Sequence, residues 1–239
     1  MSTAAVLLGH GSPDPAGRAE LGELRALVGR RLGLDVGLGV LEFPGPGLPA
    51  VDQAFAAAGA RIAAQPLILF DGLHGRHDLP AAAAGATARL GVEVRLGAAL
   101  GRDPALIELC AGRAADLRPA PGDLLLFVGR GSSEPLARAQ TEQVAAAVAG
   151  ALGVDHTVCY TGISPPSLAV GIALALSRRP RRILALPYLL HTGVLVRRVG
   201  EVLGPAAAGH GVPLDVLPHL GNAPQVVDLV ASRLEALLR

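Results

Sequence analysis

The sequence contains no lysine and no tryptophan, and only two of its 239 residues are cysteines. All 21 basic side chains are therefore arginines, and the formal net charge is only +1. A chain so close to neutrality lacks the basic field of nucleic-acid-binding domains, so we expect no nucleic-acid partner. Cys110 and Cys159 are too few and too isolated for a disulfide framework or a cysteine-rich metal site.

Aromatic residues make up only 3% of the chain, and long hydrophobic runs are missing. The apolar stretch at residues 168–176 stops at Ser177 and Arg178 and is too short to cross a bilayer. The first residues include no basic segment, and their apolar run is interrupted at His10, which is not the pattern of a secretory signal. We expect a cytoplasmic protein that does not bind membranes.

An internal repeat organises the chain. Three pairs of segments match in the same order, at offsets of 120, 121 and 120 residues: 9–12 with 129–132, 66–73 with 187–194, and 100–104 with 220–224. Three ordered matches at nearly one spacing indicate duplication. We therefore predict two similar domains, at residues 1–119 and 120–239, joined near residues 118–122.

Each copy alternates apolar strands with helices. In the first copy we expect strands at 4–8, 35–41, 62–69 and 92–96, and helices at 18–32, 48–58, 80–90 and 104–115. In the second copy we expect strands near 124–128, 157–160, 183–186 and 213–216, and a last helix whose core-facing stripe is Val226, Val230, Leu234 and Leu237. Such alternation makes parallel βαβ units. The expected fold class is α/β, with a four-stranded parallel sheet flanked by helices in each domain.

Three residues with useful chemistry follow the first three strands. His10 follows the first strand, Glu42 the second and His74 the third, so a parallel sheet would bring them to one edge. Two imidazoles and a carboxylate can bind a divalent metal or move protons near neutral pH. The alternative is that His10 caps a turn and His74 is a solvated residue. Residues 72–79 are expected to form a loop, in which His77 is solvated or supports a neighbour.

Residues 9–12 also suggest an anion-binding turn before a helix, as in a phosphate-ester hydrolase. They lack the lysine of a phosphate-binding loop and the spacing of a dinucleotide-binding motif, so this alternative is weak. His156, His210 and His219 have no carboxylate neighbours in the pattern, and a structural role is expected for each.

Residues 6–12, with Gly72-Leu73-His74 and Asp78-Leu79-Pro80, resemble the sirohydrochlorin chelatase family, the ATP-independent class II chelatases. Residues 129–133, 186–190 and 192–196 resemble the second half of its long, two-domain form. The resemblance implies insertion of a divalent metal into sirohydrochlorin, or a related polycarboxylate tetrapyrrole, with release of two protons, in a cleft between the domains. It places the family's paired histidines on His10 and His74, as metal ligands and catalysts. It implies no cofactor beyond the metal substrate, which would be Co²⁺, Fe²⁺ or Ni²⁺.

The second copy differs from the first at the positions of His10, Glu42 and His74. Arg130 stands for His10, Leu195 for His74 and Gly162 for Glu42. We therefore expect one active site per chain, with catalytic residues in 1–119 and substrate binding in 120–239. Glu42 is expected to balance charge or accept a proton. Polar side chains that are candidates to bind the substrate are Ser12, Arg76, Arg130 and Arg197.

The leading hypothesis is a sirohydrochlorin cobaltochelatase. The alternatives are a ferrochelatase that uses Fe²⁺ for sirohaem synthesis, and a tetrapyrrole or metal carrier that does not catalyse insertion. The presence of histidine and carboxylate ligands does not identify which of these metals is used, because the affinities of the divalent metals follow the same order at most such sites. The sequence is silent on the oligomeric state and leaves open the roles of His77 and of His191, which stands where the first copy has Phe70.

Overall fold

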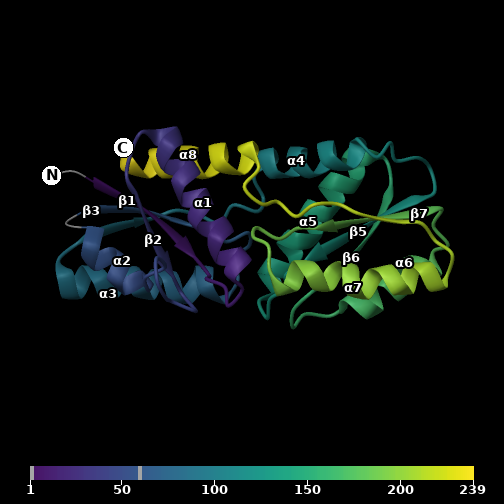
Figure 1. Cartoon of the computed structure of the whole chain (residues 1–239), viewed down its shortest axis with the longest axis horizontal. Coiled ribbons are helices and arrows are strands. Elements are labelled where there is room, and N and C mark those ends of the chain that lie inside the picture. The colour runs from purple at the N-terminus through teal and green to yellow at the C-terminus, as the bar shows by residue number, and fades with distance from the viewer. Residues whose placement is uncertain (1–2, 59–60) are drawn as a thin grey trace. The chain divides into compact units, whose positions relative to one another are not determined.

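A computed structural model describes residues 3–58 and 61–239 (Figure 1). The chain divides into two compact units, one made of Met1–Gly101 with Asn222–Arg239 and the other of Arg102–Gly221. Each unit contains a four-stranded, fully parallel sheet flanked by helices. The predicted α/β class, with two similar sheets, is confirmed. The placement of an active site in a cleft between the domains stays a prediction.

The first sheet has the strand order β2-β1-β3-β4. Its strands are β1 (Thr3–Gly9), β2 (Val36–Val40), β3 (Arg61–Pro66) and β4 (Glu93–Leu96). Leu8 in β1 pairs with Gly39 on one side and with Pro66 on the other. Because β1 has its sequence neighbours on opposite sides, the chain reverses direction across the sheet here. Ligand sites in open parallel sheets gather outside the carboxyl ends of strands at such a point.

Helices cover both faces of this sheet (Figure 1). One face carries α1 (Pro15–Leu32) and α8 (Pro224–Leu238), and the other carries α2 (Val51–Ala58) and α3 (Leu79–Leu90). The core under α2 and α3 includes Val6, Leu8, Phe55, Ile62 and Leu79. A strand that is buried on both faces needs apolar side chains at successive positions, which explains the unbroken apolar run in β1.

The second unit repeats this plan with the order β6-β5-β7-β8. Its strands are β5 (Asp123–Gly129), β6 (Asp155–Tyr160), β7 (Arg182–Pro187) and β8 (Leu214–Val216). Its helices are α4 (Pro104–Ala115), α5 (Pro135–Leu152), α6 (Leu168–Ser177) and α7 (Val194–Gly209). The register repeats as well, since Val128 pairs with Pro187 as Leu8 pairs with Pro66. The sequence offset between matching residues of the two copies is therefore 120 in β5 and 121 in β7.

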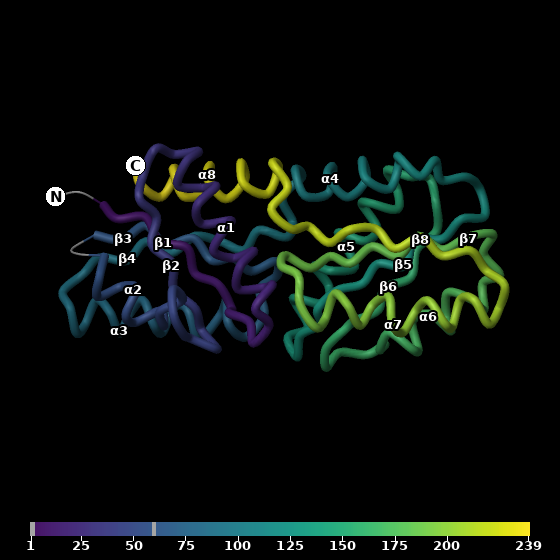
Figure 2. Tube along the Cα trace, in the orientation of Figure 1, coloured from purple at the N-terminus to yellow at the C-terminus, as the bar shows by residue number. Residues whose placement is uncertain are grey.

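The last helix of each repeat belongs to the compact unit of the other repeat. The helix α8 packs against α1, β1 and β3, and α4 packs against α5 (Figure 2). Three residues of the expected apolar stripe, Val226, Val230 and Leu234, are fully buried, and the fourth, Leu237, is half-buried. The stripe lies in the first unit. A division of labour between residues 1–119 and 120–239 stays a prediction.

Local signals set where the helices begin. The helix α1 starts at Pro15, earlier than expected, because the Asp14 carboxylate accepts a hydrogen bond from the backbone N–H of Ala16. Asp103 caps α4 in the same way through Ala105. Among the residues that the structure describes, no helix is both long and apolar enough to cross a membrane.

Candidate functional site

The backbone holds the loops after β1 and β2 side by side. The N–H of Glu42 donates to the carbonyl of His10 over 2.8 Å, and the N–H of Leu41 donates to Gly9 over 3.1 Å. Gly11 has a φ of 91°, and a Cβ there would collide with the carbonyl oxygen of Glu42. Glycine is the residue that fits this backbone, because it has no Cβ and accepts positive φ without strain. The loop geometry therefore presents His10 and Glu42 together.

The segment with His74 is helical, so the expected loop at residues 72–79 is wrong. Residues His74–Asp78 form a π-helical turn, η1, closed by a hydrogen bond from the N–H of Leu79 to the carbonyl of His74. The turn runs directly into α3, where Pro80 occupies the first helical turn and needs no N–H partner. Single π-helical turns often occur at functional sites.

The three residues at the ends of β1, β2 and β3 converge. His10 Nε2 lies 3.6 Å from Glu42 Oε1, and His74 Nε2 lies 3.8 Å from the same oxygen. The two imidazole rings have centroids 4.8 Å apart and meet edge to face at 74°. One potential ligand atom from each residue lies within 4.8 Å of the others. This is the one group of at least three such residues found in the described part of the chain.

The second nitrogen of each imidazole has its own partner. His74 Nδ1 lies 2.6 Å from Asp78 Oδ2, and His10 Nδ1 lies 3.2 Å from the carbonyl oxygen of Gly11. Both partners are acceptors, so they favour a proton on Nδ1 and a lone pair on Nε2. Both Nε2 atoms then present lone pairs on the side of Glu42. The sequence analysis did not predict the contact between His74 and Asp78. The spacing of four residues between them is the signal that could have indicated it.

The predicted substrate-binding residues belong to both units. The Ser12 hydroxyl accepts from the backbone N–H of Asp14 over 3.1 Å, so it shapes the turn before α1. Arg76 is exposed on η1 in the first unit, while Arg130 and Arg197 are exposed in the second. Arg130 follows β5, and Arg197 lies in the first turn of α7.

The loops of the second unit have the same backbone with different side chains. The N–H of Gly162 donates to the carbonyl of Arg130 over 2.8 Å, and Gly131 has a φ of 90°. This matches the pairing of Glu42 with His10 and the φ of Gly11. Arg130 thus occupies the backbone position of His10, and Gly162 that of Glu42.

The other candidate ligands lie outside the cluster. His77 is exposed on η1, and His191 is half-buried after β7. Cys110 and Cys159 are buried, and burial raises the pKa of each thiol to about 12. A metal ligand must be the thiolate, so these cysteines are poor ligands in the folded protein.

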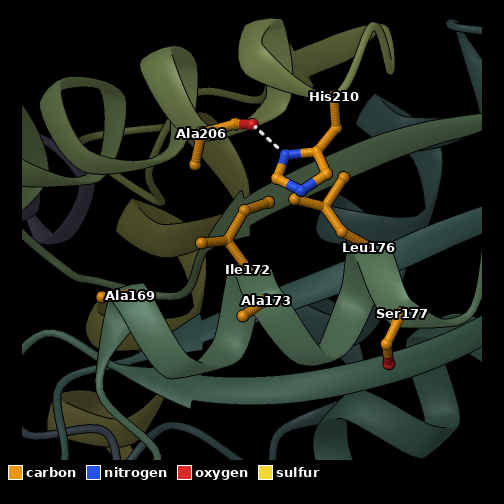
Figure 3. A pocket seen from close by; sticks show the side chains of 7 residues that line it. All are labelled: Ala169, Ile172, Ala173, Leu176, Ser177, Ala206 and His210. Carbon is orange, nitrogen blue, oxygen red and sulfur yellow. Dashed lines mark hydrogen bonds between the residues drawn. The ribbon is translucent and has the colours of Figure 1, made fainter.

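A separate pocket of about 330 Å³ lies on the second unit between α6 and α7 (Figure 3). Its lining is mostly apolar and consists of Ala169, Ile172, Ala173, Leu176, Ser177, Ala206 and His210. The Nδ1 of His210 lies 3.0 Å from the carbonyl oxygen of Ala206, which is a structural contact that fixes the ring. With one histidine and one hydroxyl, this lining does not make a metal site.

The structure defines an α/β protein with two tandem parallel-sheet units. Two histidines and a carboxylate meet at the edge of one sheet, and such a group of side chains can bind a divalent metal. The family model of CbiX matches residues 4–117 and 124–237. The chain therefore belongs to the CbiX family, with two tandem copies of the family domain. The membership in the sirohydrochlorin chelatase family that the sequence predicted is confirmed.

Individual relatives differ in the metal that their names give. The sirohydrochlorin ferrochelatase of Priestia megaterium is 30% identical over 163 residues, which cover 65% of this chain and 61% of that protein. The sirohydrochlorin cobaltochelatase of the same organism is 22% identical over 243 residues, covering 96% of this chain and 78% of that protein. The sirohydrochlorin chelatase SirB from Bacillus subtilis subspecies spizizenii, solved with cobalt, has a TM-score of 0.81 at 22% identity, over 99% of this chain and 95% of that one. At that identity the structural likeness supports the fold.

Proposed function

We propose that this protein inserts a divalent metal into sirohydrochlorin without ATP. The observation that carries the proposal is the convergence of His10, Glu42 and His74 at the carboxyl edge of the first sheet. Family membership and the names of the relatives support the same substrate. The metal is a substrate of this reaction and must be both bound and released.

The three side chains fit those two requirements. His10 and His74 supply imidazole nitrogens, which ligate iron, cobalt and nickel. Fewer than four protein ligands leave coordination positions open for the macrocycle nitrogens, whereas four protein ligands close the site, as in structural zinc sites. Insertion forms bonds from the metal to the macrocycle nitrogens and releases two pyrrole N–H protons. Glu42 and the imidazoles are the nearby groups that can accept these protons.

Substrate recognition is assigned to arginines and to exposed apolar residues. Sirohydrochlorin carries several carboxylates, and an arginine pairs with a carboxylate through two parallel hydrogen bonds. We propose that Arg130, Arg76 and Arg197 make such contacts and that Ser12 shapes the binding loop.

Large apolar side chains are exposed next to Glu42 and His74 in the first unit and next to the matching positions in the second. Phe43 follows Glu42 and is 43% exposed, and Leu73 precedes His74 and is 50% exposed. Their counterparts Ile163 and Val194 are 82% and 57% exposed. Exposed apolar surface marks a binding surface, and a flat macrocycle is a suitable partner for it. Both copies keep this feature, although only the first copy has the histidines.

We propose Co²⁺ as the metal to test first, with Fe²⁺ as the alternative. Both ions suit two histidines and a carboxylate, and the relatives include enzymes named for each. The proposed enzyme acts on sirohydrochlorin and a metal ion, with no nucleic acid or membrane partner.

The deciding experiment follows the absorbance spectrum of sirohydrochlorin under anaerobic conditions with Co²⁺, Fe²⁺ or Ni²⁺. We expect a rate above the uncatalysed reaction, many turnovers per chain and the largest kcat/KM with Co²⁺. A higher value with Fe²⁺ would identify a ferrochelatase. Stoichiometric binding of sirohydrochlorin without turnover would identify a carrier and would overturn the proposal.

A further inference from the structure

We propose that Asp78 is a positioning residue that holds His74 in the tautomer with a free lone pair on Nε2. The inference rests on the proposed function, because it assigns this lone pair to the metal substrate. His74 Nδ1 lies 2.6 Å from Asp78 Oδ2, while Nε2 lies 3.8 Å from Glu42 Oε1. A carboxylate accepts hydrogen bonds and does not donate them, so this contact favours the tautomer with the proton on Nδ1.

The backbone conformation of Asp78 differs from that of the aspartates that cap helices. Asp14 and Asp103 lie in extended backbone before α1 and α4, and each accepts a hydrogen bond from a backbone N–H of its helix. Asp78 lies within the continuous helical segment of η1 and α3, with φ of −69° and ψ of −47°, and makes no such bond. Its carboxylate instead contacts His74, four residues earlier on the same helical segment.

The second unit has no such pair. The strand register gives an offset of 121, which places Leu195 at the position of His74. The π-helical turn η1 then adds one residue that α7 does not have, so the fully buried Val199 of α7 corresponds to the fully buried Leu79 of α3. Asp78 therefore belongs to a π-helical turn that occurs in the copy with the histidine.

The two imidazoles of the site differ in their supporting acceptors. His10 Nδ1 faces the neutral carbonyl of Gly11 at 3.2 Å, whereas His74 Nδ1 faces an ionisable carboxyl group at 2.6 Å. A carboxylate behind a histidine fixes the ring orientation and makes the other nitrogen a stronger ligand. We infer that His74 binds the metal substrate more strongly than His10 does.

The test compares the intact protein with the variants Asp78→Ala and Asp78→Asn. Asp78→Ala removes the acceptor, and Asp78→Asn keeps the shape without the charge, in case the alanine variant does not fold. Asp52→Asn is the matched control, because Asp52 is an exposed aspartate of the same unit that pairs with Arg89. Long-range ¹H–¹⁵N spectra report the tautomer of each imidazole, and a His74→Gln variant assigns the signals. Titration with Co²⁺, followed by its visible absorption, reports metal affinity.

We expect the Nδ1–H tautomer of His74 in the parent and its loss in Asp78→Ala. Both Asp78 variants should bind Co²⁺ about 10- to 100-fold more weakly, with a parental melting temperature. The control should match the parent in both measurements. A parental tautomer in Asp78→Ala, or parental Co²⁺ affinity in the folded variants, would overturn the inference. Neither measurement needs turnover, so failure of the proposed chelatase activity would be recognised separately.

Discussion

The backbone N–H of Glu42 donates a hydrogen bond of 2.8 Å to the carbonyl of His10. The bond from Gly162 to Arg130 has the same length in the second unit. Duplication thus kept the loop backbone and changed the side chains that it presents. The first copy has an imidazole at His10 and a carboxylate at Glu42, and the second copy has a guanidinium at Arg130 and glycine at position 162. An arginine stays protonated, so it is a poor metal ligand and base but a good carboxylate partner.

His10→Ala and His74→Ala should each remove most metal insertion while leaving the protein folded. Each deletes an imidazole that binds the metal or accepts a proton, and general acid–base groups contribute about 10²–10⁴-fold. The measurement is kcat for each metal, together with a circular dichroism melt. His77→Ala is the control, because His77 is exposed on the same turn and lies outside the cluster. Parental kcat in a folded His10 or His74 variant would remove that residue from the mechanism.

Arg130→Ala should weaken the binding of sirohydrochlorin and leave kcat little changed. A hydrogen bond to a charged group contributes about 1.5–3 kcal/mol, which corresponds to about a 10- to 150-fold rise in KM. Arg25→Ala, at an exposed arginine of α1, should leave KM unchanged. If Arg130 instead stabilises its own loop, the substitution will lower the melting temperature and KM will stay parental.

Gly11→Ala should destabilise the protein and disturb the site. The added Cβ would collide with the carbonyl of Glu42 and would separate the loops that hold His10 and Glu42. Gly33→Ala is the matched control, because Gly33 has a φ of 65° but no atom within 4 Å of its Cβ position. The control should cost only the strain of a left-handed backbone, about 1–2 kcal/mol. Urea unfolding should show a larger loss for Gly11→Ala, and equal losses would argue against the collision.

Asp123→Asn should destabilise the protein strongly at neutral pH and much less in acid. Burial by itself raises the pKa of Asp123, but hydrogen bonds from Arg182, the N–H of Ala120 and Arg181 outweigh it and lower that pKa. A carboxyl with a lowered pKa stabilises the fold fully above its unfolded pKa of about 3.9 and loses this contribution as the pH falls through the folded pKa. Breaking one side of such a buried pair costs about 3–5 kcal/mol.

The measurement is the difference in unfolding free energy between parent and Asp123→Asn from pH 7 to pH 3. The difference should be constant at neutral pH and should shrink below about pH 4. Asp155→Asn provides the comparison in the same unit, since Asp155 pairs with Arg178 in an exposed ion pair. Its effect should stay within about 1 kcal/mol. A difference for Asp123 that does not depend on pH would show that its charge is not what stabilises the fold.

The sequence by itself determined the duplication, the parallel α/β class and the meeting of His10, Glu42 and His74. In a parallel sheet every strand ends at the same edge, so residues that follow neighbouring strands converge whatever the details of packing. The same reasoning identified Arg130 as the counterpart of His10, and the hydrogen bond from Gly162 agrees with that alignment.

Only the tertiary structure decided which sheet receives each last helix, and that Asp78 faces His74 instead of capping α3. The stripe on α8 specifies burial but not the partner, because both sheets offer an apolar face of the same kind. The π-helical turn is equally hidden in the sequence. Gly75 and Pro80 favour a loop locally, whereas in the structure η1 is continuous with α3, which packs against β4 and α2 of the first unit.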